Sequence, residues 1–163
     1  AARIGKKGAF AAAMGAAAVL SLFFFRLAPS ELGWLFALQA LVSVAAGVVL
    51  PLLWSMYADI VDYEEYRSGR RPTGLIFSSS SMSQKLGWAL GGAVTGWLLA
   101  AFGYDQSAAV QSGEAIAGVR LMMSWFPAAG CLLAAAAVLF YPLGEKRMER
   151  ITTELNLRRK TNE

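Results

Sequence analysis

Residues 73–102, TGLIFSSSSMSQKLGWALGGAVTGWLLAAF, are the stretch that decides the fold. They contain no acidic residue, and Lys85 is their only basic residue. About 20 apolar residues cross the roughly 30 Å of hydrocarbon in a bilayer, so this stretch is long enough to span a membrane as one helix. It is unusual for a span, because four consecutive serines and a lysine lie within it. We therefore predict a membrane helix that carries a polar function.

The composition of the whole chain is that of a membrane protein. Of the 163 residues, 56% are hydrophobic and only 16% are charged, which leaves too few polar residues to cover a soluble domain. The same composition excludes a disordered or collagen-like chain. Three further stretches reach spanning length, at about 8–27, 32–58 and 119–141. We predict an all-α integral membrane fold with four transmembrane helices within residues 1–142 and a basic cytoplasmic tail over residues 143–163.

Residues that the sequence lacks exclude several kinds of site. There is no histidine, and Cys131, the single cysteine, lies in an apolar run. An internal disulfide, a zinc site of the usual Cys and His type and a His-based catalytic triad are therefore excluded. We predict neither an enzyme nor a bound cofactor or metal ion. The sequence begins Ala1-Ala2-Arg3 without an initiator methionine, and we expect a piece of a longer protein.

The distribution of basic residues predicts the orientation of the spans. Two basic residues, Arg26 and Arg120, fall on one side, and Lys85 lies within a span. The twelve on the other side are Arg3, Lys6, Lys7, Arg67, Arg70, Arg71, Lys146, Arg147, Arg150, Arg158, Arg159 and Lys160. Because short cytoplasmic loops are rich in Lys and Arg, both termini and the 59–72 loop are expected in the cytoplasm. The basic residues fall in separate loops, so the lipid bilayer rather than a nucleic acid is the expected partner.

Lys85 is the most informative single residue. It lies about 18 Å along its helix at 1.5 Å per residue, near the middle of the bilayer, where a charge costs at least about 2.5–3.5 kcal/mol. The same helix face carries Ser78, Ser81, Trp88 and Gly92, flanked by Ser80 and Gln84. Polar groups beside an aromatic ring suit a hydrophilic solute, and an ion pair that serves only helix packing is the alternative. No acidic residue of this chain lies at that depth, so any partner must come from elsewhere.

A second charged stretch, DIVDYEEYRSGRR over residues 59–71, follows the second predicted span. Asp59 and Asp62 are three positions apart at the end of that span, so both can meet cations on one face. Such a cluster suits an ionic lock that forms in one transport state and breaks in another. A solvated loop whose charges contribute little is one alternative. A magnesium site on paired aspartates is another, but the DDxxD and DG-x2-AR patterns of the membrane transferases that use it are absent.

The tail carries Met148, Ile151 and Leu155 at helical spacing among many basic residues. This pattern fits a helix that lies on the anionic inner leaflet, and an ordinary solvated tail fits it equally well.

Several motifs resemble one family of transporters. They are PLLWSMYADIVDY at 51–63, TGLIF at 73–77, QKLGW at 84–88 and GY at 103–104, with RIGKK at 3–7 similar to a basic loop motif of the superfamily. The chain resembles the glycoside–pentoside–hexuronide:cation symporters, which are melibiose-permease-like members of the major facilitator superfamily.

The resemblance implies that the four spans are helices IX–XII of a twelve-helix transporter. It implies Na⁺- or H⁺-coupled uptake of a sugar or glycoside by alternating access, in a bacterial cytoplasmic membrane. The principal cation site and the N-terminal helices that complete the protein are then expected outside this chain. By the same resemblance Lys85, Ser80, Ser81 and Gln84 face the substrate and cation cavity, and Asp59, Asp62 and Arg71 belong to a cytoplasmic gate.

Two other interpretations stay open. One is a small four-span exporter that works as a homodimer; such proteins usually carry an acidic residue in the first span and a weak Lys/Arg bias, unlike this sequence. The other is a membrane scaffold subunit without transport activity, which leaves Lys85 without an explanation.

Overall fold

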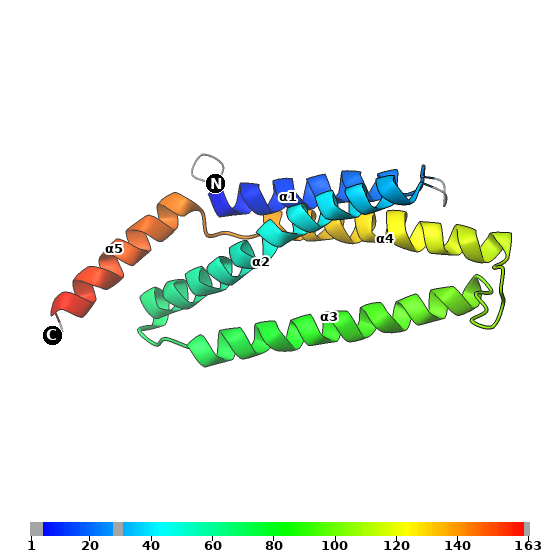
Figure 1. Ribbon diagram of the computed structural model, residues 1–163. Helices are drawn as coiled ribbons and strands as arrows, with labels where there is room; N and C mark the ends of the chain where they lie inside the picture. Colours follow the sequence, from blue (N-terminus) through cyan, green and yellow to red (C-terminus); the bar gives the residue numbers. More distant parts are fainter. Residues whose placement is uncertain (1–4, 28–30, 162–163) are drawn as a thin grey trace.

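The computed structural model describes residues 5–27 and 31–161, and the described chain is helical throughout, without a strand (Figure 1). The helices are α1 (Gly5–Phe23), α2 (Leu32–Ser68), α3 (Thr73–Ala101), α4 (Gly113–Leu139) and α5 (Glu145–Thr161). The predicted all-α fold is confirmed. Arg3, at the start of the basic RIGKK motif, lies outside the described residues.

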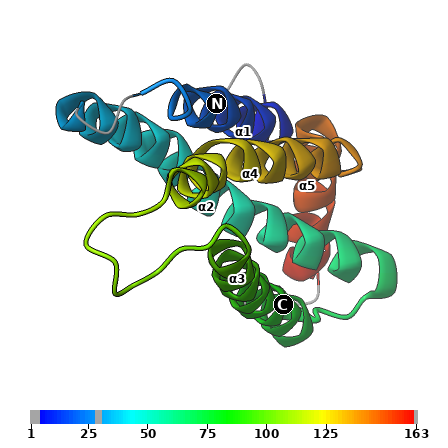
Figure 2. The ribbon, with the colours of Figure 1, turned by 90° about the vertical axis from the view of Figure 1, so that its right-hand side faces the viewer.

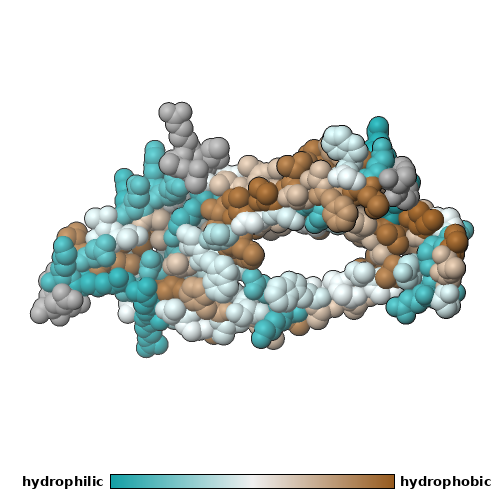
Figure 3. Space-filling view, viewed as in Figure 1, coloured by the Kyte–Doolittle hydropathy of each residue, from teal (hydrophilic) through white to brown (hydrophobic). Residues whose placement is uncertain are grey.

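Helices α1, α2 and α4 pack side by side, and α3 lies apart from α1 on the other side of the bundle (Figures 1 and 2). A cluster of buried side chains holds the three together, with Phe10 from α1, Val49 and Met56 from α2 and Val138 from α4. No residue of α3 is buried. The space-filling view shows an opening between α3 and the other helices (Figure 3). The described core therefore belongs to three helices, and α3 is only attached to it.

The attachment of α3 is made near its two ends. Near its N-terminus the Phe77 ring stacks on the Trp54 ring of α2, with 5.6 Å between ring centroids. Just past its C-terminus Phe102 packs directly on Gly118 of α4, where an added Cβ would overlap the phenyl ring. Every residue from Lys85 to Trp97, through the middle of α3, is exposed, and the serines and Gln84 lie between this stretch and the contact of Phe77 with α2.

Helices α1, α2 and α4 are long and apolar enough to cross a membrane, as predicted for three of the four spans. Helix α3 is equally long but less apolar, because serines, a glutamine and Lys85 occupy its first half. That α3 crosses the membrane stays a prediction from its length, its single charge and its place between α2 and α4.

The boundaries of α2 correct one prediction. The second span was expected to end near residue 58 and to lead into a loop over 59–72, but α2 continues to Ser68. Charged residues such as Glu64 and Glu65 are good helix formers, so nothing interrupts the helix before Gly69. Gly69 has φ of 71° and donates its N–H to the carbonyl oxygen of Glu65, the left-handed arrangement that ends a helix.

The tail differs from both predicted alternatives, because α5 is a helix docked on the end of α2. Its apolar residues bury themselves against Ile60, Tyr63 and Tyr66 of α2. The buried residues are Leu143 before the helix and Met148, Ile151 and Leu155 within it. The apolar stripe that predicted a membrane-surface helix is thus occupied by protein. Removing this stripe from water is worth roughly 25 cal/mol per Å², which a solvated tail would forgo.

Candidate functional site: a polar face on α3 and a charged network on α2

Part of the polar surface of α3 lies on the side that faces α2. Phe77, Ser80, Ser81 and Gln84 are half-buried, whereas the residues around them are largely exposed. Their spacing of three and four residues places them on one face, and Phe77 fixes the direction of that face because it contacts α2. The Ser80 hydroxyl donates to the carbonyl oxygen of Ile76 at 2.7 Å, so this hydroxyl keeps its accepting lone pairs free.

Lys85 lies at the edge of this face and is exposed. Its ammonium group makes no hydrogen bond or ion pair with any described residue. A hollow of about 590 Å³ runs beside it, lined by Ser78, Ser81, Met82, Leu86 and Ala89. The structure thus places Lys85 and Ser81 beside one hollow, and their role in a substrate cavity stays a prediction.

The other predicted cavity residues lie around this hollow rather than in it. Ser80 and Gln84 face the side of α2, and they do not line the hollow. Trp88 is 76% exposed and has no aromatic partner among the described residues. The predicted set is therefore split over two adjoining faces of α3.

An aromatic cluster that the sequence did not predict borders the polar face. Tyr57 of α2 meets the Trp54 and Phe77 rings edge-on, at 6.0 Å and 6.3 Å between centroids. Trp54 and Tyr57 share a helix face by their spacing, but no sequence signal joined them to Phe77. The cluster packs the second half of α2 against the first turns of α3.

The predicted gate residues are all paired, and Asp59 has the most enclosed pair. Its carboxylate oxygens each accept a hydrogen bond from Lys6 Nζ at 2.8 Å, which links α2 to the start of α1. Only 13% of the Asp59 side chain is exposed. Burial of a carboxylate is tolerated because the charge has a partner. The sequence pointed to Asp59 but not to Lys6, which lies 53 residues away.

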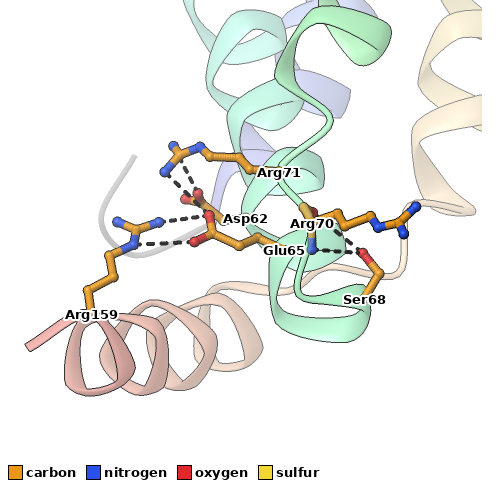
Figure 4. A network of polar contacts seen from close by, with 6 residues as sticks. All are labelled: Asp62, Glu65, Ser68, Arg70, Arg71 and Arg159. Carbon is orange, nitrogen blue, oxygen red and sulfur yellow. Dashed lines mark hydrogen bonds and ion pairs between the residues drawn. The ribbon is translucent and has the colours of Figure 1, made fainter. Parts of the chain in front are cut away.

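A second set of charges surrounds Glu65 at the end of α2 (Figure 4). Arg71 in the loop pairs with Asp62 at 3.4 Å and with Glu65 at 3.3 Å. Arg159 of α5 approaches the same Glu65 carboxylate at 2.8 Å. The hydrogen bond from Arg159 to Glu65 raises the pKa of the guanidinium. We call Lys6, Asp59, Asp62, Glu65, Arg71 and Arg159 the charged network.

Two arginines of α5 add cation–π contacts to this docking. The Arg147 guanidinium lies 5.1 Å from the centre of the Tyr63 ring, and that of Arg158 lies 5.0 Å from the centre of the Tyr66 ring. Such contacts contribute about 0.5–1 kcal/mol at exposed sites.

The charged network is no metal site. The described residues contain no group of three or more His, Cys, Asp or Glu side chains that could hold a metal ion. The acidic residues of α2 are neutralised by arginine and lysine instead. The arrangement holds the ends of α1, α2, α5 and the α2–α3 loop together.

The comparisons with known proteins decide the family. The family of MFS/sugar transport proteins matches residues 1–145. The chain belongs to this family. No solved structure matches it.

Three relatives show how similar proteins are named and how much of their length this chain covers. The glucuronide carrier protein homolog of Escherichia coli is 34% identical over 99% of this chain and 35% of its own length. A putative glycoside/cation symporter of the same organism, YagG, is 37% identical over 84% of this chain and 30% of its own length. The isoprimeverose transporter of Lactiplantibacillus pentosus is 43% identical over 60% of this chain and 20% of its own length. The chain thus spans about a third of the length of the first two relatives, which are named as transport proteins rather than enzymes.

The Glu65 pairs predict a local effect on α5. In the full-length protein, Glu65→Gln removes the charge that Arg71 and Arg159 share, so we expect amide hydrogen exchange within residues 145–161 to accelerate about twofold or more. Glu64→Gln is the matched control, because the neighbouring Glu64 has no ion pair among the described residues. Equal exchange rates in the two variants would show that the Glu65 ion pairs do not hold α5 in place.

Proposed function

We propose that this chain is the C-terminal part of a transporter that carries a sugar or glycoside together with Na⁺ or H⁺ by alternating access. The family and the names of the relatives support sugar transport. The observation that carries the proposal is Lys85, a charged side chain in the middle of a long helix with no partner in the described chain. An ionisable residue at such a position is expensive, and this marks it as functional.

The chemistry of the α3 face suits a polyhydroxylated solute. Lys85 offers three N–H donors, and the hydroxyl of Ser81 can both donate and accept. Gln84 adds an amide on the adjoining face, and Trp88 offers a ring against which the C–H face of a sugar can pack. Helix α3 contains no acidic residue, so the principal site of the coupling cation is expected on helices outside this chain.

We propose that the charged network is the part of the cytoplasmic gate that this chain contributes. Its ion pairs lie within the chain, from α2 to α1, to the α2–α3 loop and to α5. It therefore stiffens one end of the helices into a unit that can move together against the remaining helices. The ion pairs around Glu65 are half-exposed and individually weak, so they can be rearranged at small cost when the gate opens.

The proposed location is a bacterial cytoplasmic membrane crossed several times, with both ends of this segment in the cytoplasm. The apolar helices support the proposed membrane location, and the excess of basic residues at the α5 end supports the proposed orientation.

Lys85→Ala in the full-length protein tests the substrate assignment. We expect sugar uptake driven by the cation gradient to fall by roughly ten- to a hundredfold, since a hydrogen bond from a charged group contributes about 1.5–3 kcal/mol. Membrane insertion, measured by the amount of protein in purified membranes, is expected to stay unchanged. Lys160→Ala on the exposed side of α5 is the control. Normal symport by Lys85→Ala would refute the assignment.

Asp59→Lys tests the gate, because it places two positive charges where Lys6 and Asp59 now pair. A second substitution, Ser81→Cys, places a reporter thiol beside the hollow. When it is combined with Asp59→Lys, we expect this thiol to react severalfold faster with a thiol reagent added to the cytoplasmic side, in inside-out vesicles, than it does without Asp59→Lys. The change in sugar affinity is expected to be smaller. The double variant Lys6→Asp/Asp59→Lys is expected to restore the slow reaction, and Glu64→Lys serves as control. A change in affinity alone would contradict a gating role.

The orientation is tested with single cysteines in a Cys131→Ala background. A membrane-impermeant maleimide is expected to label Gln106→Cys, in the α3–α4 connection, in intact cells. Arg67→Cys, at the end of α2, is expected to react only after permeabilisation. Both positions are exposed, so access to the side chain itself does not differ. The opposite labelling pattern would invert the predicted topology.

A further inference from the structure

A second cavity lies at the end of the bundle opposite α5. It has a volume of about 350 Å³ and lies where α1 ends, α2 begins and α4 begins. Phe24, Leu35, Ile116 and Met123 are among the residues that give it an apolar lining, and Arg120 lies at its edge. Pockets of this size are typical of small-molecule sites. The charged network and the polar face of α3 contribute no residue to it.

The sequence of α4 places this cavity at the boundary of the hydrocarbon. From Leu121 to Leu139 the helix carries no charged residue, and this length rises about 28 Å, close to the thickness of the hydrocarbon core. Arg120 is the residue just before that run. Met123 therefore lines the cavity from the hydrocarbon side, and Gln111 in the α3–α4 connection lines it from the water side. The cavity sits at the depth where phospholipid phosphates meet the acyl chains.

Arg120 is free to bind an anion at this depth. Its side chain is half-buried and makes no hydrogen bond or ion pair with any residue that the structure describes. Guanidinium groups bind phosphate oxygens in pairs of hydrogen bonds, and a long side chain can lay its methylenes on an apolar surface while its charge reaches the interface. Arg26, the other basic residue at this end, is exposed and does not line the cavity.

We propose that this cavity binds a phospholipid, with Arg120 on the phosphate and the upper part of an acyl chain against Ile116 and Met123. The apolar lining distinguishes a lipid from a free phosphate ion, which would gain nothing from it. The charge of Arg120 distinguishes a phospholipid from an uncharged apolar molecule. The cavity is lined by the segment that follows α1, by α2, by the α3–α4 connection and by α4, so a lipid there bridges these parts of the chain at the end opposite the charged network.

The test is native mass spectrometry of the full-length protein in mild detergent, with added phosphatidylglycerol as the probe. We expect Arg120→Gln to weaken binding of the tightest phosphatidylglycerol by about tenfold or more, the factor for one charged hydrogen bond, and Arg26→Gln to leave it unchanged. Ile116→Trp, which fills the cavity and keeps the charge, is expected to weaken it as well. Arg120→Lys is expected to fall between wild type and Arg120→Gln.

Two further measurements distinguish a phospholipid from a lipid without a phosphate and from a free phosphate ion. Diacylglycerol lacks the phosphate and is expected to bind at least about tenfold more weakly than phosphatidylglycerol, and inorganic phosphate is expected to leave the thermal unfolding temperature unchanged. Equal lipid binding by wild type, Arg120→Gln and Ile116→Trp would overturn the proposal. So would an Arg120→Gln variant that is less stable but retains the lipid, because Arg120 would then pair with a protein group.

Discussion

The hydrocarbon of a bilayer offers no hydrogen-bond partner, and this constraint governs the whole chain. Backbone groups within it must be satisfied inside one segment, which leaves the helix as the form for each span. The charged residues of α1, α2 and α4 are accordingly collected toward the ends of these helices. Lys85 is the exception in α3, whose crossing of the membrane is a prediction. A side chain that violates the constraint must be stabilised by something that the described helices do not provide.

The arrangement of α3 follows from the same reasoning. A helix with a fully apolar surface gains by packing against its neighbours along its length, but α3 contacts α2 and α4 chiefly through Phe77 and Phe102 near its ends. Its middle keeps serines, Gln84 and Lys85 away from the core of the other three helices. In a chain that spans about a third of its relatives' length, this open face is where further helices and a polar substrate are proposed to meet.

How much of the fold and of the candidate site could be predicted depended on how far apart in the sequence the interacting residues lie. Spans are local features of length and hydropathy, and α1, α2 and α4 were predicted from them. Lys85 stood out because one charge in a long uncharged stretch is visible without any partner. The pairs of Lys6 with Asp59 and of Arg159 with Glu65 join residues 53 and 94 positions apart, and no local pattern selects them. The stripe on α5 was recognised as apolar, but its spacing does not say whether lipid or protein covers it.

The core of the bundle and its charged end are held by different forces, and this bears on how the helices of this chain can move. The core of Phe10, Val49, Met56 and Val138 is apolar, closely packed and indifferent to salt. The pairs around Glu65 lie where water screens them, so each is weak and easily exchanged. In the proposed alternating-access cycle, a rocking motion that keeps the core intact and exchanges partners only at the charged end would therefore meet a small barrier. Asp59 is the least exposed of these acids, and an unpaired charge there would be costly. Its pair with Lys6 is thus the part of the network that must move as a unit, whereas Arg71 and Arg159 are the parts free to change partners.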